Sequence, residues 1–187
     1  QVGRNFTDAE VDRLVSLYGD EDVPKGNYTR WYWAAQHAGA DQWSGCYARR
    51  TAAWVTRAGR DAFLYRWTHV PKGPSGTFPK LAHHSTEQPF VFHVLAETAE
   101  ELRESGGRYH IDASEVNLST TVVQLWASMA ASGRPATDKV RWPVFNTADR
   151  QGLVFGDEIA AERDIRGPQC DFWDEHFPPL ETPIIVS

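Results

Sequence analysis

No stretch of the 187 residues approaches the roughly 20 consecutive apolar residues that a membrane-spanning helix needs, so we expect no membrane span. The chain also lacks an excess of basic residues. Its formal net charge is -6 and its lysines and arginines are scattered, which argues against a nucleic-acid partner. The turn at 72–76 contains glycines but lacks the Lys-Ser/Thr ending of a phosphate-binding loop, so nucleotide binding is not expected.

Residues that bind metal ions are also few. Cys46 and Cys170 are the two cysteines, and neither has a second cysteine two to four residues away. The pair His83 and His84 is the only close pair of histidines, and adjacent side chains point in different directions. We therefore expect no metal site and no cofactor. From the residues alone, the cysteines form either one disulfide or two buried free thiols.

The chain begins with Gln1, and no charged leader with an apolar segment follows it. We expect that this start was made by processing, or that the chain is a piece of something longer. Three Asn-x-Ser/Thr sequons, at Asn5, Asn27 and Asn117, favour a glycosylated and secreted protein.

Aromatic residues, by contrast, are abundant, with 8 Trp, 9 Phe and 6 Tyr. Two interpretations stay open for them. Aromatic side chains dominate the burial in most cores, and they also line apolar substrate clefts. Trp31, Trp33 and Phe78 are candidates for such a cleft, with ordinary packing as the alternative.

The periodicity of apolar residues predicts a helix-rich chain with a few strands. Thr7 and Glu10 form a capping-box pattern ahead of a helix that Gly19 ends. A run of strand-forming residues at 61–68 predicts a buried strand. Further helices are predicted at 29–37, 42–58, 114–131 and 168–176, and a further strand at 153–155. We expect Gly39 to interrupt the second helix.

The segment 81–92 is the most informative part of the chain. It places His84 three residues before Glu87 and just ahead of the apolar residues Phe90, Val91 and Phe92. Histidine can take and return a proton at neutral pH, so His84 is a candidate general base. An ordinary loop or core histidine is the alternative interpretation.

A histidine base needs a nucleophile, and the sequence offers no obvious one. The Gly-x-Ser-x-Gly pattern of a nucleophile elbow does not occur, and the segment 73–77 does not fit it. No His-Gly-Gly-Gly oxyanion loop occurs either. The residues alone therefore leave His84 without an evident nucleophile.

Taken in order, five segments resemble the C-terminal part of the type-B carboxylesterase family, which includes the cholinesterases. They are the strand region 61–67, the His-x-x-Glu motif at 84–87 with its apolar trio, the helix end at 125–135, the Trp-Pro turn at 141–145 and the Cys-x-Phe-Trp segment at 170–173. The resemblance runs from about residue 40 to residue 180. It implies the C-terminal part of an α/β-hydrolase fold, in which an N-terminal part supplies most of the sheet.

The resemblance also implies a mechanism and a disulfide. His84 would be the last member of a Ser-Asp/Glu-His triad, with Glu87 supporting the turn rather than catalysing. His83 is less favoured, because only His84 stands three residues before Glu87. Cys46 would pair with Cys170, which fits an oxidising, extracellular route. The nucleophile, the oxyanion hole and the acid would come from an N-terminal chain or segment.

We therefore interpret 1–187 as the C-terminal portion of one hydrolase domain: 1–60 helical, 61–95 strand and histidine loop, 96–187 helices and tail. The expected function is a secreted carboxylic-ester hydrolase acting on small-molecule esters. One alternative is a catalytically inactive, cholinesterase-like adhesion or binding protein, because a fold does not fix a function. Another is a free-standing helical domain that only mimics these motifs.

The sequence departs from the family at two positions behind His84. His93 stands where members often have Gly, and Pro89 is expected to interrupt the short helix there. Both departures bear on the local geometry of the histidine loop.

Overall fold

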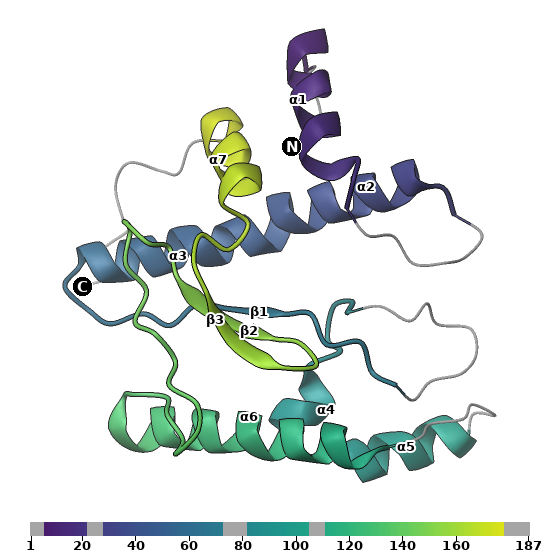
Figure 1. The fold of residues 1–187 in the computed structure, drawn as a ribbon, viewed down its shortest axis with the longest axis vertical. Coiled ribbons are helices and arrows are strands. Elements are labelled where there is room, and N and C mark those ends of the chain that lie inside the picture. Colours follow the sequence, from purple (N-terminus) through teal and green to yellow (C-terminus); the bar gives the residue numbers. More distant parts are fainter. Residues whose placement is uncertain (1–5, 22–27, 73–81, 105–110, 178–187) are drawn as a thin grey trace. The chain divides into compact units, whose positions relative to one another are not determined.

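The computed structural model describes residues 6–21, 28–72, 82–104 and 111–177. The chain forms two compact units (Figure 1). Unit 1 comprises residues 1–64, 145–150 and 164–187, and unit 2 comprises residues 65–144 and 151–163. No helix within the described ranges is long and apolar enough to cross a membrane.

Unit 1 is built from helices. They are α1 (Asp8–Tyr18), α2 (Arg30–Ala40), the π-helical turn η1 (Asp41–Gly45), α3 (Cys46–Arg57) and α7 (Gly167–His176). Helix α1 begins with the predicted capping box, in which the Glu10 carboxylate accepts from the Thr7 N–H at 2.7 Å. Helix α7 confirms the helix predicted at 168–176. Pro168 lies in its first turn, where a missing N–H costs no helical hydrogen bond.

The prediction that Gly39 interrupts the second helix is wrong. Helices α2 and α3 run through η1 as one continuous helical rod (Figure 1). A glycine inside a helix costs only about 1 kcal/mol relative to alanine, and buried residues on both sides of Gly39 hold the rod in place. The π-turn brings buried Asp41 to within hydrogen-bond distance of Tyr18 (3.0 Å) and Arg166 (2.8 Å).

Two small clusters form the core of unit 1. The first surrounds Cys46 and Cys170 and includes Phe172 and Trp173, which are at most 4% exposed. Phe6, Leu14 and Leu17 pack against this cluster from the N-terminal side. The second cluster joins α3 to the segment 145–150 and consists of Ala52, Leu64 and Phe145.

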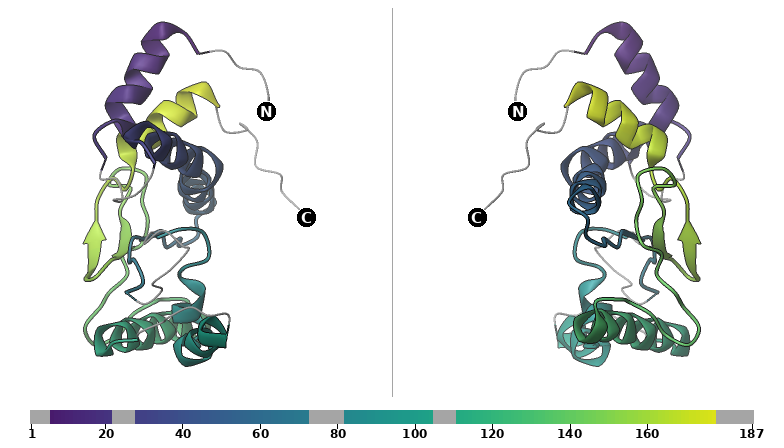
Figure 2. Two further views of the ribbon diagram at one scale, coloured as in Figure 1. Left: turned by 90° about the vertical axis from the view of Figure 1, so that its right-hand side faces the viewer. Right: turned by 90° about the vertical axis from the view of Figure 1, so that its left-hand side faces the viewer.

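Unit 2 contains a three-stranded sheet in the order β1-β2-β3. Its strands are β1 (Tyr65–Trp67), β2 (Gly152–Phe155) and β3 (Ile159–Glu162). Strand β1 pairs in parallel with β2, and β3 returns antiparallel to β2 as a hairpin that Figure 2 shows from two further directions. Strand β2 confirms the strand predicted at 153–155, whereas β3 was not predicted.

The strand at 61–68 is shorter and more exposed than predicted. Only three residues pair, Tyr65 is 38% exposed, and Arg66 is exposed as well. In the described part of the chain β1 has one neighbouring strand, so its other edge is open. Leu64, just before β1, is buried in unit 1 instead.

Three helices complete unit 2: α4 (Gln88–Val91), α5 (Leu95–Glu104) and α6 (Ala113–Ser132). Helix α6 confirms the helix predicted at 114–131. It begins at Asp112, whose carboxylate accepts from the Glu115 N–H at 3.0 Å, and ends at Gly133, whose φ of 71° suits a residue without Cβ. Helix α5 was not predicted.

Aromatic side chains join α6 to the sheet. Phe155 of β2 is fully buried, and the rings of Trp67, Trp126 and Trp142 lie 5.4 to 5.8 Å from it, centroid to centroid. Tyr65 meets Trp126 edge-on at 5.5 Å. In unit 2, then, the abundant aromatics form a core, as the first of the two interpretations predicts.

Candidate active site

His84 lies in a turn immediately before α4. The turn is held by its own backbone: the Thr86 N–H donates to the His83 carbonyl at 3.1 Å, and the Gln88 N–H donates to the Ser85 carbonyl at 3.2 Å. The Thr86 hydroxyl adds a bond of 2.7 Å to the His83 carbonyl. Ser85 has a φ of 70°, in the left-handed region, and this reverses the chain direction just after His84. The imidazole of His84 is exposed.

The two neighbouring histidines differ in their contacts. The Nδ1 atom of His83 lies 2.8 Å from the carbonyl oxygen of His84, which ties the His83 ring to the backbone. The His84 ring makes no hydrogen bond or ion pair with any residue that the structure describes. Of the two, His84 has the ring that is available to a group outside this chain.

Glu87 lies at the start of α4, and its side chain makes no hydrogen bond to any described residue. Its backbone carbonyl accepts from the N–H groups of Phe90 and Val91 at 3.0 Å each. Its carboxylate is near Tyr65: burial raises the pKa of the Tyr65 phenol, and the negative charge of Glu87 raises it further. Glu87 therefore forms part of the turn without reaching His84.

Helix α4 is anchored to α6 through Ser119, which is fully buried. The Ser119 hydroxyl donates to the Phe90 carbonyl at 2.9 Å, and the His93 Nδ1 atom lies 2.7 Å from the Ser119 hydroxyl oxygen. A hydroxyl has one proton to donate, so the His93 ring is the donor in the second bond. His93 adopts a φ of 56°, the left-handed conformation that glycine adopts without strain.

Pro89 does not interrupt the short helix, contrary to the expectation from sequence. It occupies the first turn of α4, where its missing N–H has no helical acceptor. The Val94 N–H donates to the Pro89 carbonyl at 2.9 Å and closes the helix at its other end. The histidine loop thus keeps a defined geometry despite the two departures.

The structure reveals a buried polar cluster that the sequence did not indicate. His69 is 2% exposed and lies between two carboxylates, with Nδ1 at 3.0 Å from Asp157 and Nε2 at 3.2 Å from Glu115. Glu115 is fully buried and also accepts from the Lys72 N–H at 2.8 Å. Asp112 and Glu115 have the spacing of a capping box, in which the Glu115 carboxylate would accept from the Asp112 N–H. In the structure this carboxylate lies against His69 instead.

This cluster contacts the short helix α4, which follows the His84 turn. The His69 ring meets the fully buried ring of Phe90 edge-on at 5.2 Å, and Trp67 lies 5.1 Å from Phe90. Phe90 is therefore held on one side by residues at the end of β1, and its carbonyl is held by α6. These contacts fix α4, which follows the His84 turn directly.

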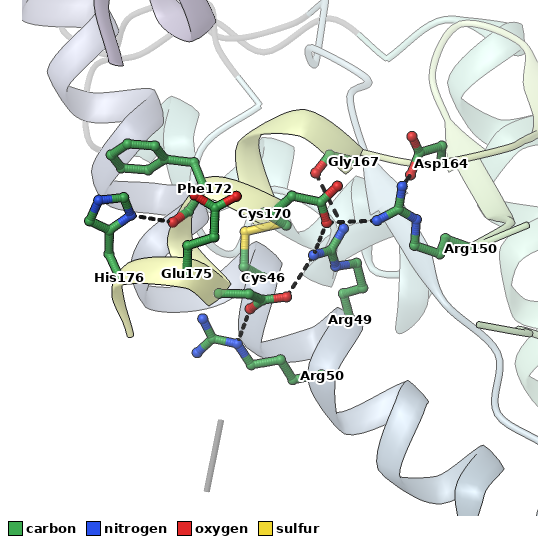
Figure 3. A network of polar contacts seen from close by, with 12 residues as sticks. Cys46, Arg49, Arg50, Arg150, Asp164, Gly167, Cys170, Phe172, Glu175 and His176 are labelled. Carbon is green, nitrogen blue, oxygen red and sulfur yellow. Dashed lines mark hydrogen bonds and ion pairs between the residues drawn. A yellow bond between two sulfur atoms is a disulfide. The ribbon is translucent and has the colours of Figure 1, made fainter. Parts of the chain in front are cut away.

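Cys46 and Cys170 form a disulfide, as the family resemblance implied (Figure 3). Their Cα atoms are 5.2 Å apart and both residues are almost fully buried. The bond ties the start of α3 to α7 across 124 residues of sequence.

The candidate cleft aromatics do not form one group in the described residues. Trp31 is 49% exposed on α2, whereas Trp33 is buried. Phe78 lies outside the described residues, as do Asn5 and Asn27 of the first two sequons. Asn117 is exposed on α6.

Comparison with known proteins gives the class of the chain. Residues 4–173 match the carboxylesterase family. This match covers most of the sequence, so the chain belongs to the carboxylesterase family, and the resemblance inferred from its motifs is confirmed.

Individual relatives agree with this assignment. The chain is 31% identical to the para-nitrobenzyl esterase of Bacillus subtilis (strain 168) over 116 residues, which is 62% of this chain and 22% of that protein. It is 24% identical to the acetylcholinesterase of Leptinotarsa decemlineata over 181 residues, which is 96% of this chain and 27% of that protein. The chain therefore spans about a quarter of the length of these relatives.

A solved structure confirms the predicted fold class. The carboxylesterase of Geobacillus stearothermophilus at pH 6.2 superposes with a TM-score of 0.66 at 19% sequence identity. The match covers 87% of this chain and 31% of that chain. The fold is thus a helix-rich part of an α/β-hydrolase fold with a small sheet.

Proposed function

We propose that this chain supplies the histidine base of a secreted carboxylic-ester hydrolase of the Ser-Asp/Glu-His type. The observation that carries the proposal is the His84 imidazole. It is exposed on a turn that its own backbone and α6 hold in place, and it has no partner among the described residues. A base in an acyl-transfer enzyme needs this combination of a fixed position and an open ring nitrogen.

In the proposed reaction, a serine from an N-terminal portion attacks the carbonyl carbon of a small-molecule ester. His84 takes the proton of the serine hydroxyl and returns it to the leaving alcohol. In the second half, water attacks the carbonyl carbon of the acyl-serine while His84 takes its proton, and His84 returns that proton to the serine oxygen as the carboxylic acid is released. A carboxylate from the N-terminal portion orients the imidazole, and backbone N–H groups there stabilise the oxyanion.

The remaining residues have positioning roles in this proposal. Glu87 helps to form the turn through its backbone carbonyl. His69 and Ser119 hold Phe90, and through it they hold the helix behind His84. Among the described residues, none of these three makes a hydrogen bond or ion pair with His84, so each would act on the reaction only through the position of the turn.

Secretion and glycosylation belong to the same proposal. The Cys46–Cys170 disulfide favours an oxidising compartment, and Asn117 is exposed on α6, although Leu118 and Ser119 of its sequon are buried. In protein from a eukaryotic secreting host, treatment with an N-glycosidase is expected to lower the apparent mass. The Asn117→Gln variant should lose the part of that shift that this site contributes. An unchanged shift would remove Asn117 from the proposal.

The test of the two-part hydrolase compares the 187-residue chain alone with protein that also contains the upstream portion. Both are assayed with a para-nitrophenyl ester. The proposal expects hydrolysis only when the upstream portion is present, and an active isolated chain would overturn it. If neither form hydrolyses esters, and the upstream elbow carries Gly or Ala in place of Ser, the adhesion or binding alternative is favoured.

A further inference from the structure

A cavity of about 180 Å³ opens in unit 1, between α3, the segment 145–150 and α7. Its wall contains four arginines, Arg49, Arg50, Arg57 and Arg150, but only two aspartates. We call this cavity the arginine pocket. Such an accumulation of guanidinium groups is unexpected in a chain whose net charge is -6.

Two of the arginines are fully engaged with carboxylates. Arg49 donates to Asp171 at 2.9 Å and to Asp174 at 2.7 Å, and Arg150 donates to Asp171 and Asp164, each at 2.6 Å (Figure 3). Burial alone raises the pKa of Asp171, but hydrogen bonds from Arg150 and Arg49 outweigh it and lower that pKa below its ordinary value. The Asp171 carboxylate is therefore ionised, and two guanidinium groups already balance its charge.

Arg50 is different, because its guanidinium is buried and only partly used. Its side chain is 6% exposed, and its Nε donates to Asp174. Among the described residues neither of its Nη atoms has a hydrogen-bond acceptor, and its other contact is the ring of Tyr47 at 4.9 Å. Neither Nη atom is a fully buried polar atom without a partner, so each reaches solvent, where an anion that enters the pocket can accept from it.

The same face of α3 provides a second unpaired cation and an apolar surface. Arg50, Trp54 and Arg57 follow one another at spacings of four and three residues, which places them on one side of the helix. Arg57 is exposed and has no carboxylate partner in the described residues. Phe145 continues the apolar wall opposite α3.

We propose that the arginine pocket binds a small organic carboxylate with an aromatic or branched apolar body. Arg50 and Arg57 hold the carboxylate, because a planar guanidinium matches its two oxygens. Trp54 and Phe145 contact the apolar body. The size is suitable, since a cavity of about 150 Å³ holds benzene in another protein. The site lies in unit 1 and does not depend on the proposed esterase activity.

The experiment uses the protein that carries this chain at its full length, with benzoate as the probe, at fixed ionic strength. Neutral benzamide tests the need for charge, and inorganic phosphate tests the need for the apolar body. The dissociation constant is measured by calorimetry, and the melting temperature is measured with and without each probe. Benzoate alone is expected to bind saturably and to raise the melting temperature.

Three variants locate the site. Arg57→Gln removes an exposed, unpaired cation and is expected to weaken benzoate binding about tenfold. Arg50→Gln is expected to weaken it at least as much. Arg60→Gln, which removes an exposed charge that does not line the pocket, should leave it unchanged. Near-ultraviolet circular dichroism checks that each variant is folded. If the Arg50→Gln variant does not fold, the Arg57→Gln variant still tests the proposal.

Four results would overturn the proposal. The first would be that benzoate does not bind, and the second that the Arg60→Gln and Arg57→Gln variants lose the same affinity. The third would be that phosphate or benzamide binds as tightly as benzoate. The fourth would be that benzoate binds the isolated chain but not protein with the upstream portion, because an acidic group of that portion would then occupy the pocket.

Discussion

The Cys46–Cys170 disulfide gives a prediction whose magnitude follows from the structure. The bond closes a span of 124 residues. In the loop-entropy account, cross-linking residues this far apart restricts the unfolded chain by about 5 kcal/mol. Removing the bond with Cys46→Ala and Cys170→Ala together should therefore lower the free energy of unfolding by about that amount.

The loss should be visible as a large shift in thermal unfolding. For a chain of this size, 1 kcal/mol changes the melting temperature by about 2–4 °C, so we expect a drop of about 10–20 °C. Circular dichroism at 222 nm measures it. The wild-type chain reduced with dithiothreitol is the matched control, because it lacks the cross-link but keeps both sulfur atoms in the core around Phe172 and Trp173.

Comparing the double variant with the reduced wild type separates the effect of the cross-link from the effect of side-chain packing. If the reduced wild type and the double variant melt together, well below the oxidised protein, the entropic account holds. If the reduced wild type melts at the oxidised temperature and only the double variant is destabilised, the stabilisation comes from packing. That result would refute the reasoning.

Two further predictions concern ion pairs of unit 1. Arg166→Met leaves buried Asp41 without its guanidinium partner and should cost about 3–5 kcal/mol in urea unfolding, whereas Arg60→Met at an exposed site should cost almost nothing; equal effects would contradict the assigned role. Hydrogen bonds from the Thr7 backbone N–H, then the Thr7 hydroxyl and His176, lower the pKa of Glu10 from 4.5 to about 2. A lowered folded-state pKa stabilises the protein above pH 4.5 and stops doing so as the pH falls through 2. The Glu10→Gln variant should therefore be less stable than wild type at pH 7 and approach it near pH 2; a constant gap would show that Glu10 does not titrate this way.

Local signals in the sequence predicted the local structure well. The capping box of α1, the length of α6 and the early proline of α7 depend on residues close in sequence, and each is present in the structure. Helix α5 was missed because, among those of its side chains that the structure describes, only Leu95 and Ala99 are buried, and two small contacts give a weak apolar period. Strand β3 was missed because Ala160, Ala161 and Glu162 are exposed and carry no strand pattern.

Contacts between residues far apart in the chain could not be predicted from local sequence patterns. The His69 cluster joins residues 46 and 88 positions apart, and no spacing rule connects them. The arginine pocket likewise needs α3 and α7, which meet only in the folded chain. The disulfide was anticipated through the family resemblance, because two lone cysteines left free thiols equally open. The structure places His84 in the turn before α4, and its role as a base stays a prediction.

The most direct test of the proposed base is kcat/KM for a para-nitrophenyl ester in protein that contains the upstream portion. The variants are His84→Asn and, as the matched control one residue away, His83→Asn. Loss of a general base of this kind should lower kcat/KM by at least about a thousandfold in the His84 variant, while the His83 variant stays close to wild type. A His84→Asn protein with wild-type activity would contradict the account.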